Sequence, residues 1–215
     1  FWHAPTRQWV MPLYVGVPDP VRRNDKGQPV IRHECHFYLS PDLKTWSFAS
    51  RFAEELFECP GLVELPLDGA RKNTRFVLWG ASGDYWVGRF DGRAFHAETP
   101  KLKGDYGANF YAAQAWDDLP GGRVVLLGWM TGGKYPGMPF NQQMGTPLEL
   151  GLVTTPAGPR LTKWPVAELA GLARGSTEVT LNGPVAPGTA LDGTAAELLD
   201  LELEDRKSTR LNSSH

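Results

Sequence analysis

The feature that most constrains the fold of this chain is a series of short segments rich in β-branched and aromatic residues. Turn-forming residues separate each segment from the next, and no strong helical periodicity interrupts the series before residue 166. Short strands at regular spacing are typical of all-β folds, and serial four-stranded units are typical of propeller blades. The sequence therefore predicts an all-β chain built from propeller blades, not a doubly wound sheet.

The predicted strands alternate with recognisable turns. They span residues 10–16, 34–39, 45–51, 61–66, 75–81, 85–90, 110–116, 123–129 and 149–154. The pairs Asp68-Gly69 and Asp91-Gly92 are typical of hairpin turns. Between two of the strands, Asp42 is expected to cap a tight turn through its side chain. Residues 166–174 are compatible with a short connecting helix.

The charge composition excludes several classes of function. Lys and Arg number 22 against 24 Asp and Glu, and no basic cluster resembles a nucleic-acid footprint. No apolar run approaches the roughly 20 residues of a membrane helix. We therefore predict neither a nucleic-acid partner nor a membrane partner.

Cysteine and histidine usage gives no sign of a metal centre or of a disulfide framework. Cys35 and Cys59 are the two cysteines, and we expect two free thiols because two cysteines do not define a framework. The closest histidine pair, His33 and His36, lacks the third ligand that a metal site needs. No metal and no organic cofactor is predicted.

The tetrapeptide Phe57-Glu58-Cys59-Pro60 is the most informative motif for chemistry. It places a carboxyl group between a large apolar residue, a thiol and a rigid turn, where its pKa should be raised. A general acid that protonates a leaving-group oxygen near neutral pH needs such a raised pKa. The alternative is a buried glutamate paired with an arginine.

Other motifs surround this tetrapeptide in a fixed order. Ser-Pro-Asp-Leu-Lys-Thr-Trp at 40–46 precedes it, whereas Asp-Tyr-Gly-Ala-Asn-Phe-Tyr-Ala-Ala-Gln at 105–114 and Gly-Trp-Met at 128–130 follow it. Together they resemble glycoside hydrolase family 32, the levanases, inulinases and invertases, from about residue 1 to residue 204. The resemblance implies a five-bladed β-propeller followed by a β-sandwich. It also implies hydrolysis of terminal β-D-fructofuranosyl linkages in levan, inulin or sucrose by a retaining mechanism.

The same resemblance implies that the chain is a fragment. The family carries a nucleophilic aspartate in a Trp-Met-Asn-Asp-Pro-Asn-Gly stretch, and a second aspartate in Arg-Asp-Pro shortly before the segment that is here Phe1-Trp2-His3; neither stretch is present. Retaining glycosidases need two carboxyl groups roughly 5 to 5.5 Å apart. We expect the nucleophile upstream of Phe1, and we expect the isolated chain to be inactive and prone to aggregation.

The resemblance also assigns roles to individual residues. It makes Glu58 the general acid/base, and it places Cys59, Asp105, Tyr111 and Trp129 at the substrate. For each of these substrate residues an alternative without a substrate role is open. Cys59 is equally compatible with a small core residue, Asp105 with a turn-former before a glycine, and Trp129 with core packing, while alternation alone does not decide where Tyr111 points.

The predicted organisation has three parts. Residues 1–165 form a partial propeller that carries the catalytic residue, and residues 166–204 form a linker and the truncated start of the β-sandwich. Residues 205–215 resemble the translation of a sequencing-library adapter and are predicted to be a non-native tail, the alternative being an ordinary polar tail.

Two other functions are compatible with the motifs. A fructosyltransferase shares the first half-reaction, so the residues named above do not separate transfer to a sugar from transfer to water. A carbohydrate-binding propeller without activity is the third reading, and retention of Glu58 argues against it. The resemblance implies an extracellular or periplasmic location for the intact protein.

Overall fold

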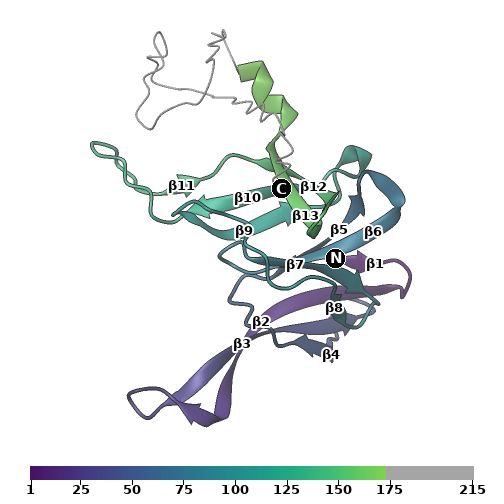
Figure 1. The fold of residues 1–215 in the computed structure, drawn as a ribbon, viewed down its shortest axis with the longest axis vertical. Helices are drawn as coiled ribbons and strands as arrows, with labels where there is room; N and C mark the ends of the chain where they lie inside the picture. The colour runs from purple at the N-terminus through teal and green to yellow at the C-terminus, as the bar shows by residue number, and fades with distance from the viewer. Residues whose placement is uncertain (173–215) are drawn as a thin grey trace, which may run out of the picture. The chain divides into compact units, whose positions relative to one another are not determined.

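The structure is a computed structural model that describes residues 1–172, and within them Phe1–Val166 form one compact unit (Figure 1). The strands of the described chain are β1 (Trp2–His3), β2 (Gln8–Arg23), β3 (Pro29–Ser40), β4 (Ser47–Phe52), β5 (Gly61–Leu67), β6 (Ala70–Trp79), β7 (Tyr85–Phe90), β8 (Phe95–Ala97), β9 (Phe110–Trp116), β10 (Val125–Met130), β11 (Gln143–Met144), β12 (Leu148–Thr155) and β13 (Gly158–Pro165). Two short 3-10 helices, η1 (Pro120–Gly122) and η2 (Ala167–Leu172), complete the description. Through residue 172, no helix has the length and apolar character needed to cross a bilayer.

The strands form three consecutive antiparallel units of four, which we call the first, second and third blades. The first is β1-β2-β3-β4 and the second is β5-β6-β7-β8. The third is β9-β10-β12-β13, with β11 paired to the end of β10. One parallel contact, Leu152 opposite Leu67, joins the second and third blades. The prediction of an all-β chain made of serial four-stranded units is confirmed.

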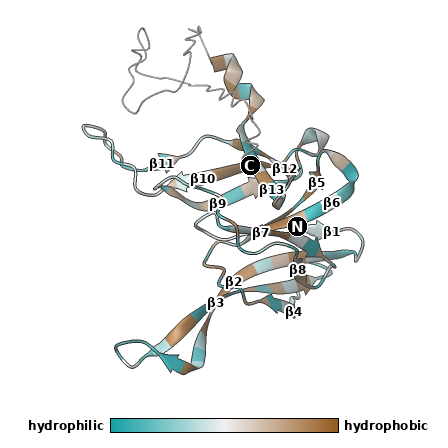
Figure 2. Cartoon of the chain, viewed as in Figure 1, coloured by the Kyte–Doolittle hydropathy of each residue, from teal (hydrophilic) through white to brown (hydrophobic). Residues whose placement is uncertain are grey.

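The hydrophobic core lies between the blades, and strand alternation explains how it is divided. In the second blade, Leu62, Leu78 and Trp86 face the first blade, whereas Val63 and Val77 face the third. Both faces of this blade are therefore buried, and fully burying one such side chain stabilises the fold by roughly 1.5 to 3 kcal/mol. In Figure 2 the hydrophobic colour also runs along β10, which contributes Leu126 to the core between the second and third blades.

Each predicted strand overlaps an observed one, and β7 and β9 have the predicted bounds. The prediction missed β1, β8 and β11, because two or three residues carry too little periodicity. It also missed β13, which begins at a glycine and ends at a proline. β2 continues past Gly16 through Pro18 and Pro20, since β1 pairs only with its first residues and leaves an edge where proline is tolerated.

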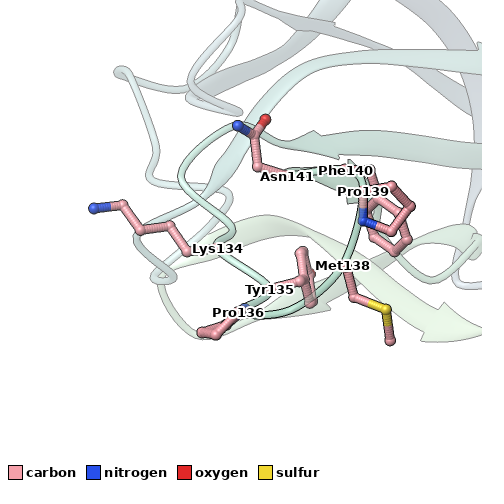
Figure 3. A pocket seen from close by; sticks show the side chains of 7 residues that line it. All are labelled: Lys134, Tyr135, Pro136, Met138, Pro139, Phe140 and Asn141. Atoms are coloured by element: carbon pink, nitrogen blue, oxygen red, sulfur yellow. The ribbon is translucent and has the colours of Figure 1, made fainter.

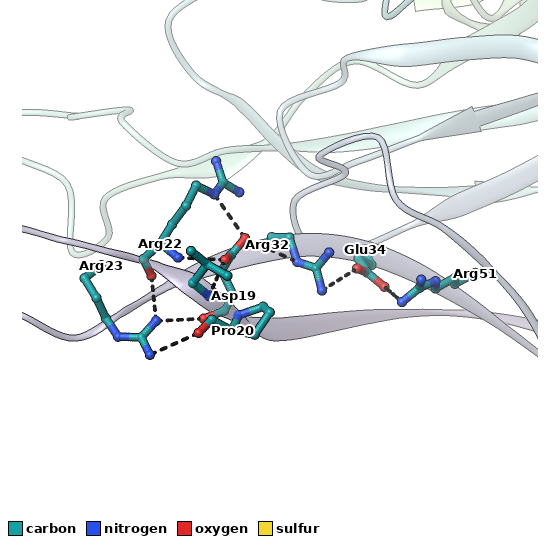
Figure 4. A network of polar contacts seen from close by, with 8 residues as sticks. Asp19, Pro20, Arg22, Arg23, Arg32, Glu34 and Arg51 are labelled. Atoms are coloured by element: carbon teal, nitrogen blue, oxygen red, sulfur yellow. Dashed lines mark hydrogen bonds and ion pairs between the residues drawn. The ribbon is translucent and has the colours of Figure 1, made fainter.

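A chain of charged side chains lines the extended hairpin of β2 and β3 (Figure 4). Asp19 pairs with Arg22 at 3.0 Å, while Arg32 and Arg51 each approach Glu34 at 3.8 Å. The Glu34 side chain is only 1% exposed, so these cations compensate a buried charge. Backbone amides at the bend, that of Arg22 first, hold the pKa of Asp19 well below its usual range. The network ties β2, β3 and β4 together.

Two of the three predicted turns form as expected, and the third is wider than predicted. Asp68 and Gly69 have φ values of 53° and 72°, as a two-residue hairpin turn requires. Asp91 instead starts a wider loop, in which its carboxylate accepts a hydrogen bond from the Ala94 amide at 2.8 Å. Asp42 caps its turn as predicted, because it accepts hydrogen bonds from two backbone amides at 2.9 Å.

The C-terminal part of the predicted organisation is only partly covered. The short helix predicted at 166–174 is present as η2, a 3-10 helix. The predicted start of the β-sandwich at 176–204 and the adapter-like tail at 205–215 lie outside the described residues. The three-part division of the chain therefore stays a prediction.

Candidate active site

Glu58 lies in the loop that joins β4 of the first blade to β5 of the second. The loop is anchored by Leu56, whose side chain is 1% exposed and belongs to the core between these blades. The Leu56 amide donates a hydrogen bond to the His33 carbonyl at 3.0 Å. Lys101 donates to the Glu55 carbonyl at 2.8 Å. The backbone before Glu58 is thus fixed by the first blade and by the segment that follows β8.

The backbone of this loop is strained. Glu55, Glu58 and Cys59 have φ values of 56°, 47° and 42°, in the left-handed region that L-residues rarely adopt. Each such residue costs about 1 to 3 kcal/mol and persists only where the surroundings impose it. Here the Ala81 amide donates to the carbonyls of both Phe57 and Glu58 at 2.9 Å. Strain of this kind, concentrated at a carboxylate, supports a functional role for Glu58.

The residue that starts β5 shows how closely the second blade packs behind the loop. A Cβ on Gly61 would collide with the Trp79 ring. The Trp79 indole in turn donates a hydrogen bond to the Ala113 carbonyl of β9 at 3.3 Å. The sequence Cys59-Pro60-Gly61 therefore leads from the strained loop into a strand that permits no side chain at its first position.

A bulge in the third blade aims Tyr111 at Glu58. The pairing of β9 with β10 shifts between Leu127 and Trp129, where β9 has one residue more than β10, and Ala112 in this stretch has a φ of 48°. The Ala112 amide donates to the Ala81 carbonyl at 2.9 Å, so β9 turns toward the second blade. Bulges beside active sites commonly redirect a side chain in this way. Tyr111, which alternation alone could not orient, is the side chain redirected here.

The Tyr111 hydroxyl donates a hydrogen bond of 2.5 Å to Oε2 of Glu58. This bond, followed by burial and the negative charge of Glu58, raises the pKa of Tyr111 to about 12. The tyrosine therefore remains a donor throughout the pH range in which glycosidases work. The Trp129 ring meets the Tyr111 ring edge to face at 6.2 Å. Glu58, Tyr111 and Trp129 thus form one connected group drawn from the β4–β5 loop and from strands β9 and β10.

Both cysteines are free, as predicted. Cys59 is half-buried next to Glu58, and burial first, then the charge of Glu58, raises the pKa of its thiol. A thiol with a raised pKa is a poor nucleophile. Cys35 is buried in the core between the first two blades, where burial raises its pKa to about 12. The raised pKa of Cys59 supports its role as an uncharged neighbour of Glu58.

Asp105 is held by a different set of contacts. Its carboxylate pairs with Lys163 of β13 at 3.2 Å and accepts a hydrogen bond from the Gly107 amide at 2.8 Å. The Lys163 ammonium also lies over the Phe110 ring at 4.5 Å. Within residues 1–172, Asp105 makes no hydrogen bond or ion pair with the group around Glu58. The predicted site residues therefore separate into Glu58, Cys59, Tyr111 and Trp129 on one hand and Asp105 on the other.

Two surface hollows are formed by the third blade and the loops next to it, and neither is lined by Glu58. One of about 290 Å³ is bordered by Asp105 and Phe110. The other, of about 710 Å³, is formed by the loop between β10 and β11 (Figure 3), in which Tyr135 and Phe140 pack at 5.6 Å while Lys134 points away. The residues that line the larger hollow include no acidic side chain. We therefore locate the candidate site by its chemistry, at Glu58, not by volume.

Sequence reasoning missed two residues beside the acid. The Tyr14 hydroxyl and Nδ1 of His33 are 2.7 Å apart, and both side chains contact the ring of Phe57. Burial first, then the charges of Glu58 and Glu55, raises the pKa of Tyr14. No motif marks these residues, because the pairing of β2 with β3 alone brings them together. Among the described residues, no group of three His, Cys, Asp or Glu side chains is placed to hold a metal ion.

Comparison with known proteins gives a consistent family. The model of the "Glycosyl hydrolases family 32 N-terminal domain" matches residues 25–165. A levanase of Bacillus subtilis (strain 168) is 32% identical over 97% of this chain and 32% of its own length. An extracellular exo-inulinase of Meyerozyma guilliermondii is 33% identical over 63% of this chain and 26% of its own length.

A solved structure agrees with the sequence matches. The exo-inulinase of Aspergillus awamori superposes with a TM-score of 0.61 and 27% identity, over 77% of this chain and 35% of that one. The chain thus spans about a third of the length of the relatives it matches. The blades described above are part of the family's propeller. On the match over residues 25–165 and the 32% identity to the levanase, this chain belongs to glycoside hydrolase family 32.

Proposed function

We propose that the protein containing this chain hydrolyses terminal β-D-fructofuranosyl linkages in levan, inulin or sucrose, and that Glu58 is its general acid/base. The observation that carries the proposal is the carboxylate of Glu58, held on a strained backbone and bonded by Tyr111 at 2.5 Å. Relatives named levanase and exo-inulinase support the substrate class. Because relatives are described as extracellular, we propose an extracellular or periplasmic location as well.

The proposed reaction retains the configuration of the sugar. An aspartate carboxylate attacks the anomeric carbon while protonated Glu58 gives its proton to the glycosidic oxygen, so the C–O bond breaks and the leaving group departs neutral. Water then attacks the fructosyl ester and passes a proton to Glu58, which regenerates the acid and releases fructose. We place the nucleophilic aspartate in a part of the full-length protein that this chain does not span.

The remaining side chains would hold the substrate. Tyr111 bonds Oε2 of Glu58, which leaves Oε1 to carry the proton toward the glycosidic oxygen. Trp129 would offer its ring to the C–H groups of the fructosyl unit. Cys59 would keep the surroundings of the acid neutral. Asp105, oriented by Lys163, would accept a hydrogen bond from a sugar hydroxyl, a charge-assisted contact.

The test uses the protein expressed from its complete coding sequence. Release of reducing sugar from levan, inulin and sucrose is measured for the wild type, for Glu58→Gln and for Glu54→Gln, an exposed glutamate of the same loop. Loss of general acid/base catalysis should lower kcat by about 10²- to 10⁴-fold in Glu58→Gln. Glu54→Gln should behave as the wild type.

Two results would contradict the proposal. Undiminished activity in Glu58→Gln would put the acid elsewhere, and absence of activity in the wild type would favour a binding protein. The products on sucrose decide between hydrolysis and transfer, because a transferase forms trisaccharide while a hydrolase accumulates fructose. Release of fructose by the isolated 215-residue chain would contradict an external nucleophile.

A further inference from the structure

Three ring side chains form a connected group beside Glu58 that the proposed reaction does not use. The Phe57 ring meets the His33 ring at 4.8 Å and the Tyr14 ring at 5.7 Å, both edge to face. Tyr14 and His33 stack at 5.8 Å and share a hydrogen bond of 2.7 Å. We call Tyr14, His33 and Phe57 the aromatic shelf.

The shelf lies on the face of the first blade that packs against the second blade. It extends beyond the part of this face that the second blade covers. Val10 and Phe37 lie on that face and are buried in the core. Tyr14 and His33 follow on the same face, since they are separated from Val10 and Phe37 by an even number of residues along β2 and β3. Both are half-buried. The apolar surface of the blade therefore emerges into solvent beside the catalytic loop.

Phe57 caps this surface while remaining open to solvent. Its side chain is 41% exposed, whereas that of its neighbour Leu56 is 1% exposed. The loop thus has one large residue that anchors it in the core and a second that is not needed for that purpose. A single exposed aromatic residue is unremarkable. A ring in contact with a phenol and an imidazole, in the residue that precedes the acid, offers a flat apolar surface with polar groups at its edge.

The shelf and the proposed fructose-binding residues reach Glu58 from different blades. Tyr111 and Trp129 belong to the third blade, whereas Tyr14 and His33 belong to the first. The charge of Glu58 acts on the Tyr14 hydroxyl, which places the shelf within electrostatic reach of the acid. A general acid lies at the bond between the two parts of its substrate, because it protonates the oxygen that joins them. Side chains that flank the acid and take no part in the proposed fructose contacts can therefore meet the leaving part.

We propose that the aromatic shelf binds the sugar unit that leaves, so that Tyr14, His33 and Phe57 form a leaving-group subsite for a fructan oligosaccharide. This inference rests on the proposed function of Glu58. The rings contact the C–H face of the sugar. Because Nδ1 of His33 is occupied by the Tyr14 hydroxyl, its Nε2 is the atom that hydrogen-bonds a sugar hydroxyl.

The first test compares leaving groups. In the full-length protein, Phe57→Ala is assayed on an inulin-type trisaccharide and on methyl β-D-fructofuranoside, whose leaving group is too small to reach the shelf. We expect kcat/KM to fall about tenfold on the trisaccharide and less than about twofold on the methyl fructoside. Phe48→Ala is the matched control, because Phe48 is a 53% exposed ring of the first blade in contact with His36 and Tyr38, not with the loop. It should change neither value.

Equal losses on both substrates would overturn the inference, since Phe57 would then act only by holding Glu58 in place. An unchanged value on the trisaccharide would overturn it as well. Tyr14→Phe retains the ring but frees His33, and the inference predicts a smaller loss that is again confined to the trisaccharide. A loss on methyl β-D-fructofuranoside alone would contradict it.

A binding measurement separates failure of the inference from failure of the proposed function. Calorimetric titration of Glu58→Gln, with and without Phe57→Ala, is carried out with the same trisaccharide and with fructose. We expect Phe57→Ala to weaken trisaccharide binding about tenfold and to leave fructose binding unchanged. If the wild type binds the trisaccharide without hydrolysing it, the proposed function fails and the shelf is still tested. No difference between the two proteins in trisaccharide affinity would overturn the shelf.

Discussion

The loop of Glu58 and the turn of Asp105 both carry an acidic residue of the predicted site, yet they are built differently. The first has three non-glycine residues with left-handed φ values and receives hydrogen bonds from the second and third blades. In the second, the carboxylate accepts a hydrogen bond from the Gly107 amide and forms an ion pair with Lys163. Strain supported by several elements indicates a position that must be kept. The turn of Asp105 is held by an ion pair and a hydrogen bond, which points to binding and not to chemistry.

This contrast predicts different kinetic effects in the two regions, and they are the largest expected. In the full-length protein, Glu58→Gln should lower kcat by about 10²- to 10⁴-fold, since proton transfer occurs only in the transition state. Asp105→Asn keeps an acceptor for Gly107 but loses its charge, so it should raise KM about tenfold with kcat nearly unchanged. Steady-state kinetics on inulin measure both. A fall in kcat for Asp105→Asn would place the two regions in one catalytic unit.

The hydrogen bond from Tyr111 should have the next largest effect. Tyr111→Phe keeps the ring against Trp129 but removes the donor to Glu58. A hydrogen bond to a charged group is worth about 1.5 to 3 kcal/mol, so kcat should fall roughly 10- to 100-fold. Tyr135→Phe, in the loop between β10 and β11, is the control and should be neutral. An equally active Tyr111→Phe enzyme would show that the backbone alone orients the acid.

Backbone strain makes a smaller and opposite prediction for stability. Glu55 is exposed, and the contact that holds it uses its carbonyl, not its side chain. Glycine removes a left-handed penalty of about 1 to 2 kcal/mol at the cost of about 0.5 to 1 kcal/mol of chain entropy. Glu55→Gly should therefore stabilise the protein by roughly 1 kcal/mol in urea unfolding. Glu54→Gly, whose backbone is not left-handed, should destabilise it by about 0.5 to 1 kcal/mol.

The pH dependence gives the smallest effect. The folded pKa of Tyr111, about 12, lies above its ordinary value of 10.0. A group whose folded pKa is raised contributes stability that is complete below the unfolded pKa and is lost as pH rises through the folded pKa. The contribution of Tyr111 should thus disappear between pH 10 and pH 12. The pKa of Tyr14 is raised as well, so ultraviolet titration should show more than one late tyrosinate, and Tyr111→Phe should remove one of them. An unchanged late titration in Tyr111→Phe would assign it to other residues.

Much of the fold was predictable because it depends on local patterns. Alternation of apolar residues located the central strands of all three blades, and Asp68-Gly69 fixed its hairpin through the left-handed conformation that such pairs tolerate. Strands of two or three residues, such as β11, were not predictable, because pairing with a longer neighbour creates them. The full length of β2 depended on an unpaired edge that sequence does not reveal.

The candidate site was predictable where a motif marks it. Glu58 and Cys59 follow from four consecutive residues, but the direction of Tyr111 depends on a bulge at Ala112, an unusual residue for a left-handed position. Lys163 contacts Asp105 from 58 residues away along the chain, so no local pattern predicts this contact. Tyr14 and His33 meet through strand register alone. Contacts between distant segments are what the sequence could not supply.

The most direct test of the account asks whether Glu58 gives a proton to the leaving group. Full-length wild type and Glu58→Gln are compared on sucrose and on p-nitrophenyl β-D-fructofuranoside, whose nitrophenolate departs without protonation. If Glu58 is the general acid, the substitution should slow the glycosidic cleavage step on sucrose by about 10²- to 10⁴-fold and that on the nitrophenyl substrate by less than about tenfold. An equal loss on both substrates would show that Glu58 is not the acid and would contradict the account.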